Sequence, residues 1–434
     1  MKISVIGCGF LGAVYAAGMA SLGHDVVGID IDEQKLERLK AGHSPFFEPG
    51  LDELLLEAQN RGSLRFSSDF ADTASSTMHF LCVGTPQLDG SLAADVSYVD
   101  AAVRSLVPYL EASDVIVGKS TVPVGTAARL SPLVLDAGAE LIWNPEFLRE
   151  GHAVKDTLHP DRLIYGVRDE TDAAAAIAAL DEAYAPMLDE GTVRMIMNYQ
   201  TAELVKNSAN SFLATKISFI NAMAELCDAA GADVTELAEA LGLDERIGRK
   251  FLNAGLGFGG GCLPKDIRAL QAQAEELGVD SAVNFLNDID HINQSQRSRL
   301  VELTRRICGP LEGMRLVVLG AAFKPDSDDV RDSPALDVAQ QLQDAGADVV
   351  VCDPHATGNA KLRFPDLAYT PELAEAVAGA DALLLLTEWK QFRQLDPYQL
   401  SSQVARTVMI DGRNVLDPTK WRNAGWTFGA LGRP

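Results

Sequence analysis

One of the six cysteines, Cys262, lies in the glycine-rich run GFGGGCLPKD, residues 257–266. Glycines let a ligand approach the backbone closely, and a cysteine near basic groups can act as a thiolate nucleophile. Lys265 and Asp266 follow Cys262 within the same run. The pattern therefore predicts a nucleophilic cysteine, with a small buried thiol beside a turn as the alternative.

A lysine and an asparagine stand four residues apart in a long segment without proline. Lys206 and Asn210 project from one face if this segment is a helix. Such a pair can bind an alkoxide as its charge develops. The alternative is a solvated polar stripe on the helix surface.

Two further runs follow predicted strands, and ligands bind at the carboxyl ends of strands in open α/β sheets. The run NPEFLRE, residues 144–150, contains Glu146 and Glu150, and STVP contains Thr121. Two carboxylates there can handle water or protons, and a hydroxyl can place a water molecule. A surface acidic pair is the alternative interpretation.

The start of the chain predicts a dinucleotide site. Gly7, Gly9 and Gly12 form G-x-G-x-x-G between a predicted strand and a predicted helix, and Asp30 ends the next strand. In this setting the glycines admit a pyrophosphate and the carboxylate accepts from the ribose hydroxyls. A carboxylate also repels a 2′-phosphate, so the expected cofactor is NAD rather than NADP. A glycine-rich turn without a ligand is the alternative.

Two cations follow strands near the end of the chain. Lys324 and Arg413 are candidates for binding a phosphate or a sugar, or else surface cations. His152 and His159 have no third ligand in sight, so no metal site is predicted.

Composition narrows the classes of function. The formal charge of −24 over 434 residues disfavours nucleic acid and anionic membranes as partners. The six cysteines contain no CxxC pair, which indicates a reducing, cytoplasmic compartment. No apolar stretch is long enough for a membrane span.

The pattern of apolar runs predicts an α/β protein with two Rossmann-like, doubly wound parallel-sheet domains joined by a helical domain with one long central helix. The domains are expected at residues 1–198, 199–308 and 309–434. The long helix is expected to begin near residue 199 and to run for roughly 30 residues. Strands are expected at residues 2–6, 25–30, 79–83, 115–118, 140–143, 314–320, 347–354 and 381–387, with a strand end near 409–414.

Over its whole length the chain resembles the UDP-glucose/GDP-mannose dehydrogenase family. The resemblance favours the branch that acts on UDP-glucose because of EPGLDELL at 48–55 and the pairing of LREG with HPDR at 159–162. Phe251 and Leu252 depart from a Tyr-Asn pair common in the family. The shared motifs are GCGFLG at 7–12, VGTP at 83–86, STVPVGT at 120–126, NPEFLREG at 144–151, KNSANSF at 206–212, GFGGGCLPKD at 257–266 and FKPDSDDVRDSP at 323–334.

The resemblance implies roles for these residues. Cys262 would be the nucleophile, Lys206, Asn210 and Asp266 would handle the oxyanion, a water and protons, and Glu150 would act in thioester hydrolysis with Thr121 and Glu146 nearby. The NAD site would be lined by Gly7, Gly9, Gly12, Asp30, Lys35, Thr85, Thr121, Glu150 and Lys265. The UDP-sugar would be held by Phe147, Leu148, Lys206, Asn210, Arg246, Phe258, Gly259, Lys324 and Arg413, with Arg246 reaching the partner subunit's site.

The implied reaction is the NAD-dependent, four-electron oxidation of UDP-glucose to UDP-glucuronate through a thiohemiacetal and a thioester on Cys262. The central domain would form a homodimer or higher homo-oligomer, and the last domain would bind the UDP-sugar. The nearest alternative is the same chemistry on GDP-mannose or a UDP-N-acetylhexosamine. Other classes are a two-electron hydroxyacid dehydrogenase, which needs no cysteine, and a non-catalytic NAD-binding protein.

Overall fold

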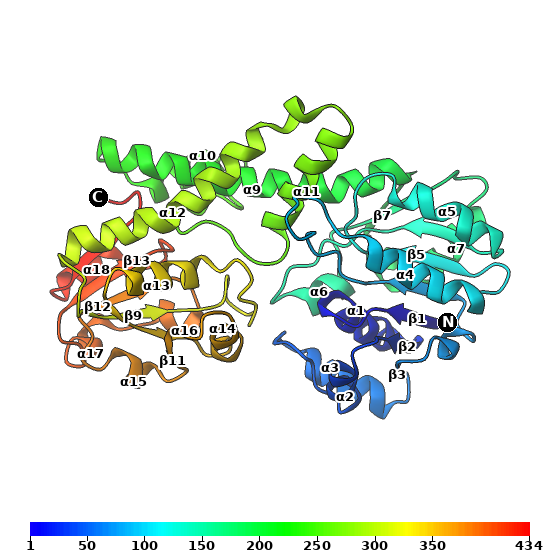
Figure 1. Ribbon diagram of the computed structural model, residues 1–434, viewed down its shortest axis with the longest axis horizontal. Helices are drawn as coiled ribbons and strands as arrows, with labels where there is room; N and C mark the ends of the chain where they lie inside the picture. The colour runs from blue at the N-terminus through cyan, green and yellow to red at the C-terminus, as the bar shows by residue number, and fades with distance from the viewer. The chain divides into compact units, whose positions relative to one another are not determined.

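The computed structural model describes residues 1–434, and the chain divides into two compact units. Unit 1 consists of Met1–Ala209 and Arg268–Asp280, and unit 2 of Asn210–Ile267 and Ser281–Pro434. Figure 1 labels many of the helices and strands of each unit. None of the helices combines the length and apolarity that crossing a bilayer requires.

Unit 1 is built on an eight-stranded sheet in the order β3-β2-β1-β4-β5-β6-β7-β8. Neighbouring strands are parallel except β6 and β7, which pair antiparallel through Trp143 and Gly166. Chain order reverses between β1 and β4, the switch point at which open α/β sheets bind ligands. The strands are β1 Lys2–Ile6, β2 Asp25–Ile29, β3 Leu64–Ser67, β4 Met78–Leu81, β5 Val115–Gly118, β6 Glu140–Trp143, β7 Arg162–Val167 and β8 Val193–Asn198.

Helices cover both faces of this sheet. This is seen from the side chains of β1, which belong to two separate apolar clusters. Ile3 and Val5 pack in one cluster and Ile6 packs in the other. A strand buried on both faces reads as a continuous apolar run, which is why β1 was predictable. The helices are α1 Phe10–Ser21, α2 Glu33–Lys40, α3 Leu51–Asn60, α4 Ser97–Leu106, α5 Thr126–Asp136, α6 Ala153–Leu158, α7 Ala174–Ala183 and α8 Ala185–Asp189.

A long helix, α9, spans Tyr199–Ala230, and its 32 residues confirm the predicted central helix. The division between the units falls within α9 and again within α11, Leu263–Glu276. Glu203, Lys206, Asn207 and Asn210 are all buried on α9, at positions i, i+3, i+4 and i+7. That spacing puts the four polar side chains on one face of the helix.

Unit 2 contains a second sheet of six parallel strands in the order β11-β10-β9-β12-β13-β14. The strands are β9 Arg315–Leu319, β10 Asp348–Cys352, β11 Ala368–Thr370, β12 Ala382–Leu385, β13 Val408–Asp411 and β14 Thr427–Ala430. Its helices are α10 Val234–Gly242, α12 Phe285–Cys308, α13 Pro334–Asp344, α14 Thr357–Arg363, α15 Leu373–Val377, α16 Lys390–Arg393, α17 Pro397–Leu400 and α18 Pro418–Asn423.

The fold class predicted from the sequence is confirmed, but five strands were not predicted. Four of them, β3, β8, β11 and β14, are the edges of the two sheets. Of these, β8 is largely exposed and β3 alternates between buried and exposed residues, so neither carries a continuous apolar run. The fifth, β7, begins at Arg162, the last residue of the polar HPDR run. The domain boundaries at 198 and 308 stay a prediction.

Candidate active site

The turn after β1 shows why three glycines stand there. Gly7 has a φ of +87°, and a Cβ on Gly12 would lie 1.8 Å from the carbonyl oxygen of Gly7. A Cβ on Gly9 would meet no protein atom within 4 Å. Gly7 and Gly12 are thus required by the turn itself, whereas Gly9 leaves the backbone open to a ligand at the N-terminal end of α1, which favours an anion.

The carboxylate of Asp30 is fixed at the end of β2. It accepts hydrogen bonds from the backbone N–H of Cys8 at 2.7 Å and of Asp32 at 3.0 Å. Lys35 forms an ion pair with the same carboxylate at 2.7 Å. An immobilised acceptor beside an open glycine turn fits the ribose and pyrophosphate of a dinucleotide.

The position of Asp30 leads to a prediction about cofactor choice. The value of kcat/KM with NAD should exceed that with NADP by at least about 100-fold, because a carboxylate close to a 2′-phosphate is strongly repelled. Asp30→Ser should lower the ratio of kcat/KM with NAD to that with NADP, and Asp25→Ser, at the exposed first residue of β2, should leave it unchanged. Steady-state NADH and NADPH formation measures both, and equal efficiencies in the wild type would contradict the role of Asp30.

The loop after β5 is held by buried polar side chains of unit 1. The Thr85 hydroxyl donates to the carbonyl of Thr121 at 2.7 Å. The Glu203 carboxylate accepts from the backbone N–H groups of Gly125 and Ala127, both at 2.7 Å, and so caps the start of α5. Thr121 therefore lies on a loop that is anchored from α9 and from the loop after β4.

Burial raises the pKa of Glu203 to about 7, above its ordinary value of 4.5. Between these values the folded protein holds a proton that the unfolded chain has lost, so the stability contributed by this carboxyl falls as pH rises through that window. A variant without this ionisable group should therefore become more stable relative to wild type as pH rises. The variant Glu203→Gln should gain up to about 3 kcal/mol relative to wild type between pH 4.5 and pH 8.

Urea unfolding of wild type and Glu203→Gln across this pH range measures that difference. The variant Glu37→Gln, at an exposed position on α2, is the control and should track wild type at every pH. A difference between wild type and Glu203→Gln that does not change with pH would show that Glu203 ionises normally.

The loop after β6 carries Glu146, which faces Lys206. The Lys206 ammonium donates to one carboxylate oxygen of Glu146 at 3.0 Å, and the other oxygen accepts from the backbone N–H of Leu148. The same ammonium lies 5.7 Å from the centre of the Phe147 ring. Unit 1 thus brings four predicted site residues together within one loop and one helix face.

The far end of this loop is fixed by a residue distant in sequence. Glu48 accepts from the backbone N–H groups of Gly151 and Ala153, each at 2.7 Å, and caps α6. Half-buried Glu150 lies immediately before these amides. At the near end, Lys119 donates to the Asn144 side chain at 3.0 Å, and burial lowers the pKa of this lysine to about 8.

Unit 2 places the exposed Cys262 directly before α11. One turn later, the buried carboxylate of Asp266 accepts from the Asn210 amide at 2.6 Å and pairs with Lys265 at 2.7 Å. The N-terminal end of a helix favours negative charge, such as that of a thiolate. Four residues of the predicted catalytic and cofactor sets are therefore adjacent in this unit.

The glycine loop before Cys262 is held from two sides. The Asn293 side chain accepts from the backbone N–H of Phe258 at 2.8 Å and donates to its carbonyl at 2.9 Å. The Arg413 guanidinium donates to the carbonyls of Gly257, Phe323 and Leu386 at 3.0, 3.1 and 2.7 Å. Arg413 thus supports the loop through its backbone contacts, a function that the sequence did not suggest.

The remaining predicted substrate residues of unit 2 lie in different surroundings. A Cβ on Gly259 would lie 2.1 Å from the carbonyl oxygen of Asp332, so this glycine packs tightly. The Lys324 ammonium lies 5.2 Å from the centre of the Phe323 ring. Arg246 is exposed and is paired with Asp244 at 2.6 Å.

The two departures from the family pattern have different structural settings. Phe251 adopts a φ of +66°, a left-handed conformation that costs energy for a bulky residue. Leu252 is buried in an apolar cluster with Ile220, Val234 and Ala238. Leu252 is therefore a core residue.

Residues that the sequence did not single out anchor the predicted ones. Glu48, Glu203 and Asn293 bind the backbone of the three loops, and each does so from another helix or loop. Only Glu203 had a signal, since it lies three residues before Lys206 on the same helix face. The other two are recognisable only once the chain is folded.

Comparison with known proteins identifies the family of the chain. The sequence matches three domains of the UDP-glucose/GDP-mannose dehydrogenase family: the NAD binding domain over residues 1–188, the central domain over 200–295 and the UDP binding domain over 317–418. A UDP-glucose 6-dehydrogenase of Rhizobium meliloti (strain 1021) is 40% identical over the whole of both chains.

Solved structures of two nucleotide-sugar dehydrogenases are similar to this chain over its whole length. A UDP-glucose dehydrogenase from Pyrobaculum islandicum superposes with a TM-score of 0.89 at 37% identity, covering 100% of this chain and 98% of that chain. A UDP-D-ManNAc dehydrogenase from Pyrococcus horikoshii gives 0.84 at 27% identity, covering 100% and 99%.

An NAD-binding domain and a UDP-binding domain in one chain define an NAD-dependent oxidoreductase that acts on nucleotide sugars. The chain belongs to the UDP-glucose/GDP-mannose dehydrogenase family.

Proposed function

We propose that the protein oxidises UDP-glucose to UDP-glucuronate, consuming two NAD⁺ and one water and releasing two NADH and protons. One observation carries this proposal: an exposed Cys262 stands one helical turn from a buried Asp266 that is bonded to both Asn210 and Lys265. A dehydrogenase that stopped at the two-electron stage would need no nucleophile beside this acid. The full-length identity of 40% to a UDP-glucose 6-dehydrogenase supports the choice of substrate.

In the first stage, Lys206 and Asn210 bind the C6 oxygen and stabilise the negative charge that develops on it. Asp266, linked to Asn210 at 2.6 Å, accepts the hydroxyl proton directly or through water. NAD, when bound, supplies the acceptor for the hydride lost in each oxidation. The product of this stage is an aldehyde at C6.

In the second stage, the Cys262 thiolate adds to the aldehyde carbon and forms a thiohemiacetal. Its oxidation leaves a thioester, so the carbon stays attached to the protein throughout. Glu150, with Glu146 and Thr121, positions and deprotonates the water that attacks the thioester. Collapse of the resulting tetrahedral adduct expels the Cys262 thiolate and releases the carboxylate.

A second candidate substrate is a UDP-N-acetylhexosamine, favoured by the likeness to the Pyrococcus horikoshii enzyme at 27% identity; GDP-mannose is a third. NADH formation with a panel of UDP-glucose, UDP-N-acetylhexosamines and GDP-mannose separates them. UDP-glucose should give the highest kcat/KM and about two NADH per sugar, as an alcohol taken to an acid requires. One NADH per sugar, or a higher kcat/KM for another substrate, would contradict the proposal.

The protein is also proposed to act as a homodimer formed through α9. Phe212, Phe219 and Leu226 are 65%, 46% and 60% exposed and lie seven residues apart, on one face of the helix. A repeated apolar face of this kind favours helix–helix pairing. Arg246 would then complete the partner subunit's site. Sedimentation of the wild type against Phe219→Asp tests this, and a monomeric wild type would refute it.

A further inference from the structure

The segment at residues 323–334 packs against the loop that carries Cys262, and only its lysine has a proposed role so far. The backbone N–H of Gly260 donates to the carbonyl of Arg331 at 2.8 Å. The side chain of Arg331 lies against the next residue: a Cβ on Gly261 would lie 2.3 Å from its Cζ and 2.4 and 2.6 Å from its two Nη atoms. A guanidinium group therefore covers the residue that directly precedes the nucleophile.

The orientation of this guanidinium is set by its own segment. Its Nε and Nη2 donate to one oxygen of Asp329 at 2.8 and 2.6 Å. Asp332, the residue after Arg331, has a φ of +45°, a strained conformation for a residue with a side chain. The Asp332 carboxylate is held by Arg297 at 2.9 Å. All three of the nearest atoms to the Gly261 position belong to the guanidinium, so the cationic member of the pair faces the loop.

We propose that Arg331 is a positioning residue for Cys262, which holds the cysteine's loop and favours its thiolate by supplying positive charge. This rests on the proposed function, in which Cys262 is the nucleophile. Other charged groups near the loop are Lys265 and Asp266 on α11, which pair with each other at 2.7 Å. Arg413 donates to the carbonyl of Gly257 at 3.0 Å, and Arg297 pairs with Asp332 at 2.9 Å. Asp329 partly neutralises Arg331 from the 323–334 segment. A cation beside a cysteine raises the thiolate fraction and with it the rate of reaction with electrophiles.

Alkylation by iodoacetamide, without substrate, tests this directly. Cys262 is exposed and the other five cysteines are buried, so mass spectrometry of the full chain follows one thiol. Arg331→Gln should slow alkylation at pH 7 by about three- to ten-fold and move the half-maximal pH of the rate upward by roughly half a unit to one unit. Arg331→Lys should keep part of the wild-type rate, because it retains the charge.

Asp329→Asn separates charge from structure. Freed from its anionic partner, the guanidinium should raise the alkylation rate and lower the half-maximal pH, the opposite of Arg331→Gln. If Arg331 had only a structural role, both substitutions would change the alkylation rate in the same direction. A pH profile of Arg331→Gln that superimposes on that of wild type overturns the proposal, and so does a slower rate in Asp329→Asn.

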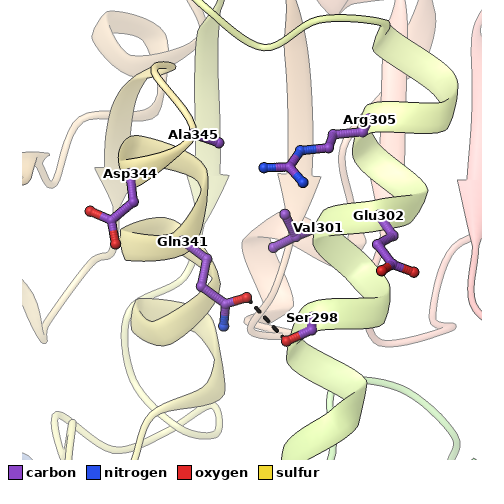
Figure 2. A pocket seen from close by; sticks show the side chains of 7 residues that line it. All are labelled: Ser298, Val301, Glu302, Arg305, Gln341, Asp344 and Ala345. Atoms are coloured by element: carbon purple, nitrogen blue, oxygen red, sulfur yellow. Dashed lines mark hydrogen bonds between the residues drawn. The ribbon is translucent and has the colours of Figure 1, made fainter.

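Arg305→Gln is the matched control, since it removes an arginine from the same unit far from the glycine loop in sequence. Arg305 lines a hollow of about 310 Å³ between α12 and α13, and Figure 2 shows it there with Gln341 and Ser298. Its alkylation profile should equal that of wild type. Because alkylation needs no turnover, a failure of the proposed reaction would appear separately, as turnover that persists in Cys262→Ala.

Discussion

Cys262→Ala should lower the rate of UDP-glucuronate formation by at least about 10⁴-fold, because no other group of the chain is proposed to form the thioester. The first oxidation can still occur, so NADH formation should stop near one equivalent per sugar. NAD binding should be unchanged, since Gly9 and Asp30 belong to unit 1 and are untouched. NADH stoichiometry with mass spectrometry of the products measures the effect.

Cys262→Ser sharpens this result. A serine hydroxyl is a much weaker nucleophile and its ester is hydrolysed more slowly than a thioester, so either turnover nearly ceases or an acyl-enzyme accumulates in the intact mass spectrum. Cys308→Ala, at a buried cysteine of the same unit, is the control and should keep wild-type stoichiometry. If Cys262→Ala made UDP-glucuronate near the wild-type rate, Cys262 would be only a small residue beside a glycine loop.

Asp266→Asn should lower kcat by about 10² to 10⁴-fold, the usual range for loss of an acid–base group. The substitution is nearly isosteric, but it removes the charge that Lys265 pairs with at 2.7 Å and one acceptor for the Asn210 amide. Asn210 would then lose the bond that orients it toward the C6 oxygen. The free energy of unfolding should fall by about 1 to 3 kcal/mol, since the ion pair between Lys265 and the buried Asp266 is lost.

Single-turnover kinetics with UDP-glucose and NAD separates chemistry from binding in this variant. The control is Asp288→Asn, which removes an exposed carboxylate from the first turn of α12, as Asp266 lies in the first turn of α11. The control should retain wild-type kcat. A kcat for Asp266→Asn within about threefold of wild type would show that Asp266 has only a structural role in the loop.

Local sequence patterns predicted the structural features that depend on residues close together in the chain. The central strands β1, β5 and β6 were predicted with the bounds observed, because each is an apolar run buried on both faces. The dinucleotide turn was predicted from its three glycines, of which Gly7 and Gly12 are required by the turn itself. The long helix followed from apolar periodicity and the lack of proline.

Tertiary structure decided what holds the loops in place. Glu203 binds backbone N–H groups 78 and 76 residues away, and Asn293 clamps Phe258 across 35 residues. The Arg413 guanidinium donates to three backbone carbonyls, contacts that its place after a predicted strand did not indicate. The edge strands β3 and β8 were missed because they are only partly covered and lack an apolar run. Sequence by itself determined the fold class, and it predicted which groups are capable of chemistry, since both depend on local spacing. Only the folded structure shows which group anchors which loop. These contacts join residues that are far apart in sequence, and their spacing follows no regular pattern.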